Sequence, residues 1–300
     1  MRAGFLGPSG TNSHAALAAA PGDWEPVALP TVAAAVRAVQ TGELPRALVP
    51  IENSREGGVG ATLDALVFDA PDVVIVGELV HRVSYCLAAA DRVAPDEIRT
   101  VHSHPQASAQ CAAFLREHAP AAAIVAASST ADAVRAVAAG DMLAGAAPHA
   151  AIGTRHAAEL YGAVVLAEGI EDDEENATRF AWLARRVPAG DDRHVDGAAT
   201  PGHRPHAGAA PRRETKTALV FWGAGDRAPG WLVACLGEFA SREINLTRIE
   251  SRPRRVGLGH YMFFCDLEGD ARDPLVAGAI AGLRGHCEAV RVLGSFPAAS

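Results

Sequence analysis

The chain lacks the features that would point to nucleic acid, a membrane or an export route. Only 5% of its 300 residues are aromatic, and 27 Lys and Arg against 35 Asp and Glu leave a net charge of −8 with no basic block. An anionic ligand must therefore be held by local donors, and nucleic-acid binding is not predicted. No apolar stretch approaches membrane-spanning length, and the N-terminus does not have a signal-peptide pattern. We expect a cytoplasmic protein without a membrane partner.

Cysteine is also scarce, and its spacing excludes two kinds of site. The five cysteines are odd in number, widely spaced and set among apolar residues, with no CxxC pair or His-rich companion. A disulfide framework or a zinc site is therefore not predicted. We expect buried thiols in a reducing compartment, and neither a metal nor a cofactor. These residues are Cys86, Cys111, Cys235, Cys265 and Cys287.

The first part of the chain alternates short apolar strands with Ala-rich helices, a pattern typical of the α/β class. We predict strands at residues 3–6, 47–51, 73–80, 83–89, 100–102, 122–126, 143–147, 164–166 and 179–186. We predict helices at residues 13–20, 32–40, 62–69, 105–117, 131–139 and 149–160.

A segment rich in Gly, Pro, Ala, His and Arg interrupts this pattern at residues 193–213. It has no periodicity and cannot bury a core, so we interpret it as a flexible linker whose histidines are solvated and do not form a metal site. Beyond it, strands at 217–222, 245–251, 260–267 and 289–294 and helices at 230–243 and 274–286 follow the ferredoxin-like order βαββαβ. We therefore predict domains at residues 1–187 and 214–300, joined by a linker at 188–213.

Several predicted strand-to-helix turns carry polar side chains. Gly7-Pro-Ser-Gly-Thr11 can turn sharply and point N–H groups at an anion, but it matches neither GxGxxG nor a Walker loop. Asn53 and Ser54 follow the next strand, at the edge where open α/β sheets bind ligands. Ser103-His-Pro-Gln106 places a capping residue before a helix that begins with Pro. Each turn also has a plain interpretation as an ordinary cap or βα turn.

The stretch Asn176-Ala-Thr-Arg-Phe180 closes an acidic run and opens an apolar segment. Thr178 offers a steerable O–H donor, and Arg179 can grip a carboxylate with two N–H groups. The alternative is a strand start with a surface Thr and a solvated Arg. Together with the polar turns, the stretch favours a small anionic ligand held by neutral donors and one Arg in a cleft.

Taken together, these motifs resemble the prephenate dehydratase family. The N-terminal part is similar in Gly7-Pro-Ser-Gly-Thr11, Pro50-Ile-Glu-Asn-Ser-Arg-Glu-Gly57, Ser103-His-Pro-Gln106, Ala158-Glu-Leu-Tyr161 and Asn176-Ala-Thr-Arg-Phe180. The C-terminal part resembles the family's ACT regulatory domain in Ile244-Asn-Leu-Thr-Arg-Ile-Glu-Ser-Arg-Pro253. The motifs keep the family's order across almost the whole chain.

The resemblance implies a catalytic domain with two lobes like those of a periplasmic binding protein, with the site in the cleft between them. The family converts prephenate to phenylpyruvate, and phenylalanine inhibits it by binding at paired ACT domains. We therefore expect prephenate as substrate, phenylalanine as effector, and a homodimer or homotetramer. No helical segment like chorismate mutase precedes Met1, which predicts the monofunctional form.

The resemblance also implies residue roles. Thr178 is the expected catalytic residue, with His104 as a possible source of the proton that reaches the leaving hydroxyl. The expected substrate-binding residues are Arg179, Asn53, Ser54, Ser103, Gln106, Thr11 and Asn176. The expected effector-binding residues are Gly230, Leu232, Val233, Asn245, Leu246, Glu250, Ser251, Arg252 and Pro253.

The chain departs from the family's pattern in two of these motifs. Asn12 stands where the family usually has an aromatic residue, and Trp231 replaces the usual Ala of Gly-Ala-Leu-Val, which bears on the fit of the effector. The linker is also longer than usual. Two rival functions remain open: dehydration of arogenate, whose amino group replaces the keto oxygen, and a binding protein that senses an amino acid without catalysis.

Overall fold

The computed structural model describes residues 1–141, 148–186, 215–223 and 228–299. The predicted strand at 143–147 and the predicted linker at 188–213 lie outside these residues. The contacts divide the chain into two compact units. The first unit comprises Met1–Ala35, Leu48–Gly57 and Val80–Arg179, and the second comprises Val36–Ala47, Gly58–Leu79 and Phe180–Ser300. No described helix is long and apolar enough to cross a membrane.

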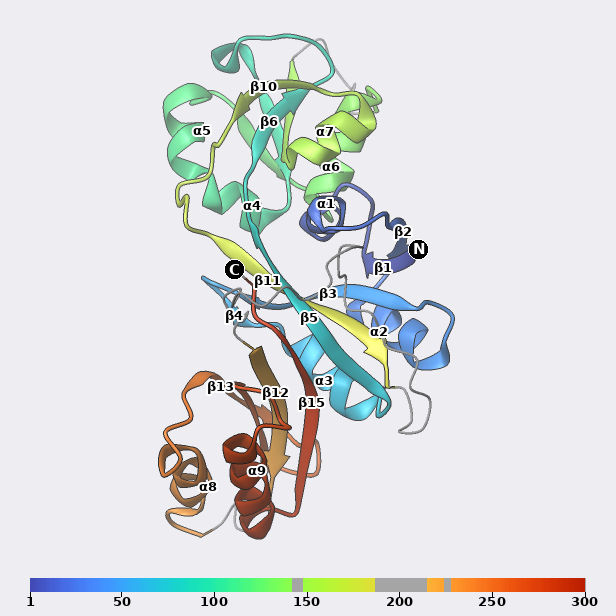
Figure 1. Cartoon of the computed structure of the whole chain (residues 1–300). Coiled ribbons are helices and arrows are strands. Elements are labelled where there is room, and N and C mark those ends of the chain that lie inside the picture. The colour runs from blue at the N-terminus through green and yellow to red at the C-terminus, as the bar shows by residue number, and fades with distance from the viewer. Residues whose placement is uncertain (142–147, 187–214, 224–227, 300) are drawn as a thin grey trace, which may run out of the picture. The chain divides into compact units, whose positions relative to one another are not determined.

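One sheet has the strand order β2-β1-β3-β11-β5, with the short β4 beside β3 (Figure 1). Its strands are β1 (Arg2–Leu6), β2 (Glu25–Leu29), β3 (Arg46–Asn53), β4 (Gly57–Gly58), β5 (Val73–Arg82) and β11 (Ala177–Arg185). The helices between them are α1 (Asn12–Ala19), α2 (Val32–Thr41) and α3 (Gly60–Phe68). The parallel order of β1 and β2 and the helical connection between them are those of an α/β fold.

A second sheet, within the first unit, has the order β10-β6-β9-β7-β8. β7 is parallel to β8 and β9, whereas β6 is antiparallel to β9 and β10. The strands are β6 (Cys86–Ala89), β7 (Thr100–Ser103), β8 (Ala123–Ala126), β9 (His149–Gly153) and β10 (Val164–Glu168). The helical elements are η1 (Pro95–Glu97), α4 (Pro105–Gln110), α5 (Ala112–His118), α6 (Thr130–Ala138) and α7 (Arg155–Tyr161).

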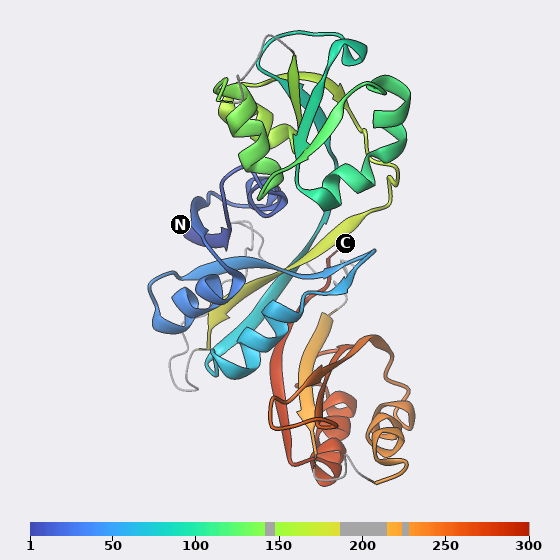
Figure 2. The same cartoon turned by 180° about the vertical axis from the view of Figure 1, so that it is seen from behind.

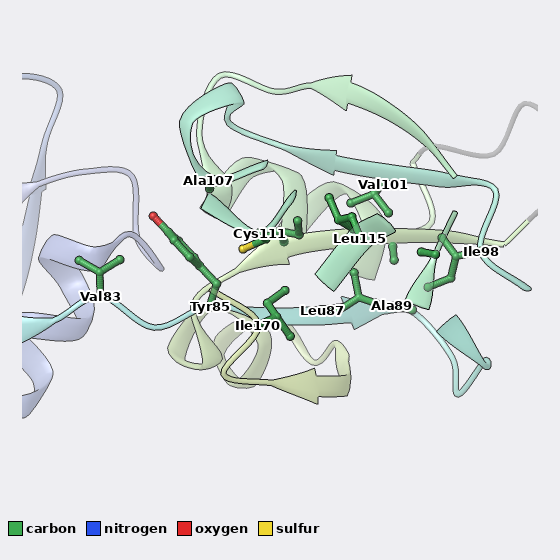
Figure 3. Packing of buried hydrophobic residues seen from close by; sticks show 13 residues of the cluster. Val83, Tyr85, Leu87, Ala89, Ile98, Val101, Ala107, Cys111, Leu115 and Ile170 are labelled. Carbon is green, nitrogen blue, oxygen red and sulfur yellow. The ribbon is translucent and has the colours of Figure 1, made fainter. Parts of the chain in front are cut away.

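Helices cover both faces of this second sheet (Figures 1 and 2). Successive residues of β6 point to opposite faces, so Leu87 packs with α4 and α5 while Ala88 packs with α6 and α7. Figure 3 shows the first of these clusters, in which Leu115 lies beside Val101 and Cys111 lies on the side toward Tyr85. Two buried faces require apolar residues at consecutive positions, and all four residues of β6 are buried.

The helix predicted at 149–160 is wrong in its first half, where residues 149–153 form β9. Ala150 and Ala151 are good helix formers, but they lie between β6 and β7 and are fully buried there, so tertiary pairing overrides propensity. The predicted helix at 105–117 breaks at Cys111. The N–H of Asp172 donates to the Gln110 carbonyl (2.6 Å). In a continuous helix this carbonyl would accept a hydrogen bond from within the helix.

The strand β2 was missed because most of its residues are exposed and lack an apolar period.

The C-terminal part of the second unit forms an antiparallel sheet with the order β13-β14-β12-β15. Its elements are β12 (Thr215–Trp222), α8 (Trp231–Ala240), β13 (Leu246–Pro253), β14 (Tyr261–Glu268), α9 (Pro274–His286) and β15 (Ala289–Pro297). Phe239 of α8 and Leu283 of α9 pack with Leu219 and Leu267 of the sheet, forming the core. The predicted βαββαβ order and fold class are confirmed.

Residues of β5 and of the C-terminal sheet contact one another within the second unit. The Glu78 side chain, only 1% exposed, binds Lys216 Nζ at 2.9 Å and accepts from the N–H of Ala299. The backbone of Gly294, at φ +154°, lies so close to Ile75 that a Cβ there would overlap the Ile75 carbonyl. A glycine is therefore required at this position both by its dihedral angle and by its neighbour.

We expect Gly294→Ala to lower the free energy of unfolding by about 2–4 kcal/mol, because the new methyl group is both strained and overpacked. The matched control is Gly285→Ala in α9, where a Cβ meets nothing within 4 Å. This control should change stability by less than about 1 kcal/mol, in the stabilising direction. Urea denaturation of both variants measures the difference, and equal midpoints would contradict the expectation.

Candidate active site

The end of β3 meets the start of β11 through one side-chain amide. Asn53, the last residue of β3, donates from Nδ2 to Thr178 Oγ1 at 3.0 Å, to Asn176 Oδ1 at 3.0 Å and to the Ala177 carbonyl at 3.2 Å. Next to it, the Ser54 N–H donates to the Ala177 carbonyl (2.9 Å), and Ser54 Oγ accepts from the Ala177 N–H (3.0 Å). Thus four predicted site residues from two distant parts of the chain lie together: Asn53, Ser54, Asn176 and Thr178.

The turn after β3 determines which way the Asn53 amide faces. Its Oδ1 accepts from the backbone N–H groups of Arg55 (3.0 Å) and Glu56 (3.2 Å). Because a backbone N–H can only donate, Oδ1 must face the turn and Nδ2 must face Thr178. The Thr178 oxygen is therefore an acceptor from Asn53. Its own proton has no acceptor within hydrogen-bonding distance among the described residues, so this proton is free to reach a ligand.

Asn176 is 2% exposed and holds the other side of this cluster. Its Nδ2 donates to Gln110 Oε1 at 3.2 Å, which leaves Oδ1 to face Asn53. Gln110 was not predicted as a site residue. The available signal was its spacing from Gln106, because residues four apart share one face of a helix. Gln106 in turn donates to the Glu56 carboxylate, so the two glutamines of α4 contact both strand ends.

His104 is the N-cap of α4, whereas the sequence left the choice between His104 and Ser103 open. Its Nδ1 accepts from the N–H of Gln106 at 3.3 Å. The neutral ring must therefore carry its proton on Nε2, which faces away from the cap. Among the described residues no hydrogen bond joins His104 to Thr178, so a proton path between them stays a prediction.

Arg179 makes a two-point contact with Glu52, with Nε and Nη2 each 2.9 Å from Oε2. Side chains alternate along a strand, so Arg179 lies on the opposite face of β11 from Thr178, and Glu52 lies on the opposite face of β3 from Asn53. The Arg179 side chain is 12% exposed. Its predicted role in holding the substrate is not tested by these contacts.

Two other predicted binding residues use their hydroxyl protons inside the protein. Thr11 caps α1 by accepting from the His14 N–H (3.4 Å) and donates to the Leu6 carbonyl (3.0 Å). Ser103 is fully buried and donates to the Ile152 carbonyl at 2.9 Å. In this structure both hydroxyls hold strand ends and turns in place, and neither donates toward the Asn53–Thr178 cluster.

Residues from α1 and from the α7 region hold the turn at 7–11. Thr154 Oγ1 donates to the Gly10 carbonyl (2.8 Å), and the Tyr161 hydroxyl donates to the Ser9 carbonyl (2.8 Å). His14 Nδ1 accepts from the Gly10 N–H at 3.0 Å. Gly10 has φ +88°, and a Cβ there would press against Tyr161 at 3.2 Å. The first motif and the Ala158–Tyr161 motif are therefore parts of one contact.

Asn12, which departs from the family's usual aromatic residue, lies beside Tyr85. Its Nδ2 donates to the Tyr85 hydroxyl at 3.5 Å, while its Oδ1 is buried and has no hydrogen-bond partner among the described residues. Burial raises the pKa of Tyr85 to about 12, although the bond from Asn12 opposes this. Tyr85 is therefore neutral at physiological pH. Among the described residues, no hydrogen bond joins Asn12 to the Asn53–Thr178 cluster.

The C-terminal sheet carries a pocket of about 190 Å³ at the start of α8. Three predicted effector residues line it, namely Gly230, Leu232 and Val233. The remaining walls, not predicted as binding residues, are Ala228, Trp231, Gly259, Tyr261 and Phe263. Trp231 donates from Nε1 to the His286 carbonyl at 2.7 Å and packs against Phe263.

The other predicted effector residues belong to the end of the preceding loop and to β13, and none of them lines this pocket. Asn245 donates to Glu268 (2.9 Å), Glu250 pairs with Arg248 (3.2 Å), and Arg252 binds Asp64 (2.9 Å). The residues outside the pocket are Asn245, Leu246, Glu250, Ser251, Arg252 and Pro253. Within one chain the predicted effector site is therefore in two separate pieces.

Comparison with known proteins agrees with these motifs. The prephenate dehydratase family model matches residues 3–188. The chain belongs to the prephenate dehydratase family. A prephenate dehydratase of Mycolicibacterium vanbaalenii is 38% identical over 308 residues, which cover 98% of this chain and 90% of the relative. The predicted family and the predicted class of carbon–oxygen lyase are confirmed.

Solved structures show the same fold over the whole chain. The crystal structure of prephenate dehydratase from Arthrobacter aurescens in complex with L-Phe is 37% identical, with a TM-score of 0.81 and coverage of 99% of this chain and 90% of that one. GqqA, described as a novel type of quorum quenching acylase, is 28% identical with a TM-score of 0.81, and the match covers 100% of this chain and 98% of that one.

We expect the stability of the protein to depend on pH through His14. Its ring is 8% exposed, stacks on Phe5 and contacts His156 Nε2 at 3.1 Å. Burial, and next the charge of His156, lower the pKa of His14 to about 4. The native state thus favours the neutral ring. The contribution of the neutral His14 to the free energy of unfolding is present above pH 6.5 and is lost as the pH falls toward 4.

Between those two values the free energy of unfolding should fall by up to about 1.4 kcal/mol per pH unit because of His14. Urea denaturation across this range measures the slope. His14→Asn keeps an acceptor for the Gly10 N–H but does not titrate, so its slope should be shallower by that amount. Identical slopes for the two proteins would show that His14 is not the source.

Proposed function

We propose that Thr178 assists the departure of the ring hydroxyl when the chain converts prephenate to phenylpyruvate. In this reaction the bond to the ring carboxylate breaks, carbon dioxide leaves, and its electron pair enters the ring. The carbon–oxygen bond to the ring hydroxyl breaks in turn, and the oxygen takes a proton to leave as water. The ring becomes aromatic, which supplies the thermodynamic drive, so the enzyme has to bind the dianion and assist the leaving group.

The uncommitted proton of Thr178 is the single observation that supports this role. Thr178 Oγ1 accepts from Asn53 Nδ2, and a donor bound to a hydroxyl oxygen makes that hydroxyl a stronger donor. A Thr hydroxyl is still a weak acid. We therefore propose that Thr178 hydrogen-bonds the leaving oxygen and that His104 is the source of the proton, because an imidazole ring can act as a general acid.

We further propose that the surrounding polar groups bind the two carboxylates of the substrate. Asn53, Ser54 and Asn176 border Thr178 directly, and Gln106 contacts the same turn through Glu56. For Arg179 to bind a substrate carboxylate, that carboxylate must take the place of Glu52. Thr11 and Ser103 would act through the turns that they hold.

Removal of the Thr178 hydroxyl should cut turnover far more than substrate binding. For Thr178→Val, which keeps the shape of the side chain, we expect kcat to fall by about 100- to 10,000-fold, the usual range for lost proton assistance. KM should change by less than about threefold, since ground-state contacts remain. Thr178→Ser keeps the hydroxyl and should retain most of the activity. A loss of kcat/KM that lies entirely in KM would show that Thr178 only binds.

An ultraviolet assay for phenylpyruvate, run beside one with arogenate, tests the substrate. We expect prephenate to be the preferred substrate. A higher kcat/KM for arogenate would favour the sister activity, and ligand binding without product from either substrate would favour a binding protein. The same purified sample serves all of these measurements.

We propose that phenylalanine inhibits the chain from the pocket at the start of α8. The relative from Arthrobacter aurescens was crystallised with L-Phe. In this chain Gly230, at φ +83°, precedes α8, whose first N–H groups can bind a carboxylate. Leu232 and Phe263 offer apolar walls for a benzyl group. Val233 is 74% exposed, which fits closure of the pocket by a second chain in a homodimer or homotetramer.

We expect Val233→Asp to weaken phenylalanine binding at least tenfold, because it places a charged carboxylate beside the apolar benzyl group and the carboxylate of the effector. The matched control is Leu275→Asp on α9, where an exposed apolar side chain does not line the pocket (63% exposed). Calorimetry should give the control an unchanged affinity. An absence of heat for the unsubstituted protein at millimolar phenylalanine would remove the proposed sensor.

We propose that the two domains predicted from the sequence have different functions. Residues 1–187 are catalytic, and residues 214–300 are regulatory. Residues 188–213 fall outside the described part of the chain. We also propose a cytoplasmic location, which the free thiols fit, since four of the five cysteines are buried.

A further inference from the structure

Two side chains of β13 pack against a glycine-rich segment that leads into α3. Glu250 and Arg252 are two residues apart and so point to the same face of β13. A Cβ at Gly58 would overlap the Glu250 carboxylate, and one at Gly60 would lie 2.7 Å from Arg252 Cζ. A side chain at either glycine would therefore displace the end of the Glu250 or Arg252 side chain from its present position.

An ion pair joins the same strand to α3. Arg252 donates from Nε to Asp64 Oδ1 at 3.2 Å and from Nη2 to Oδ2 at 2.9 Å, which is a two-point contact. Arg255 adds a bond to Oδ2 at 2.8 Å. The Asp64 side chain is 14% exposed. Burial works to raise the pKa of Asp64, but the bonds from the two arginines outweigh it and lower the pKa, so the pair is charged.

The opposite end of α3 is held by β15. Arg291 donates to the carbonyl oxygens of Leu66 (2.8 Å), Ala70 (2.8 Å) and Val73 (3.3 Å), which are acceptors at and beyond the helix C-terminus. Burial lowers the pKa of Arg291. Thus strands of the C-terminal sheet bind α3 near both of its ends. A movement of these strands would therefore move the helix.

The chain upstream of α3 leads directly to the candidate active site. Gly58 follows Asn53 by only five residues in the sequence, and the intervening Arg55 and Glu56 supply the N–H groups that orient the Asn53 amide. A shift of Gly58 and Gly60 must be taken up within this short turn. The orientation of Asn53, and with it the bond to Thr178, is therefore sensitive to the position of β13.

We propose that the Asp64–Arg252 ion pair is the contact that couples effector binding in the C-terminal domain to the Asn53–Thr178 cluster. This proposal rests on the proposed inhibition by phenylalanine. Glu250 and Arg252, predicted to bind the effector, instead transmit its binding: when β13 shifts, the glycine segment and α3 shift with it. Coupling of this kind is reciprocal, so substrate must weaken effector binding by the same factor by which effector weakens substrate binding.

The test removes the ion pair in two independent ways, neither of which touches the catalytic cluster or the pocket. Asp64→Asn keeps the shape of the side chain and deletes its charge. Gly60→Ala places a methyl group under the Arg252 guanidinium while improving the helix propensity of α3. Asp270→Asn is the matched control, because Asp270 pairs with Arg272 in the same unit and no contact among the described residues joins Asp270 to α3.

For both test variants we expect kcat and KM without effector to stay within about twofold, and calorimetric affinity for phenylalanine to stay within about threefold. The ratio of uninhibited to inhibited rate at saturating phenylalanine should fall at least about fivefold, within the usual range of allosteric coupling. The reciprocal effect of substrate on phenylalanine affinity should shrink equally. The control should behave as the unsubstituted protein, and urea denaturation confirms that each variant is folded.

Two results would overturn the proposal. One is full inhibition in both test variants with normal phenylalanine affinity, which shows that the signal passes elsewhere. The other is a loss of phenylalanine binding itself, which shows that the ion pair shapes the effector site. Failure of the proposed function is visible separately, because the unsubstituted protein would then show neither turnover of prephenate nor heat with phenylalanine.

Discussion

One hydrogen-bonded amide, that of Asn53, connects the features on which the proposed chemistry depends. Two backbone N–H groups fix its oxygen, so its nitrogen has to face Thr178 and Asn176. A single polar side chain thereby joins the end of β3 to the start of β11 and sets the direction of a hydroxyl proton. The fold brings these strand ends together, and the backbone of a short turn does the orienting.

The sequence predicted the residues of this cluster better than it predicted their partners. Asn53, Ser54 and Thr178 follow from strand ends and family motifs, which are local patterns. Gln110 and Asp64 were missed because their partners are 66 and 188 residues away, and no local period encodes such pairs. The error at β9 has the same origin: an alanine-rich segment is a strand only because its neighbours in space are strands.

Adjacent residues in a motif also need not share a task. The stretch at 176–180 invites the interpretation that Thr178 and Arg179 hold one ligand together. In a strand they face opposite sides, and Arg179 binds Glu52 while Thr178 binds Asn53. The sequence alone indicates that neighbouring side chains of this strand alternate between its two faces. Which face carries the site can be seen only from the contacts with the neighbouring strand. In the same way, the alternation of side chains along β13 does not indicate that Arg252 contacts α3.

Trp231 gives the pocket at the start of α8 an optical property. The indole forms part of the pocket wall, its N–H is bound to the His286 carbonyl, and its ring lies against Phe263. Indole emission depends on the polarity and hydrogen bonding around the ring. A ligand that entered this pocket would therefore change the fluorescence of the native chain, without any label.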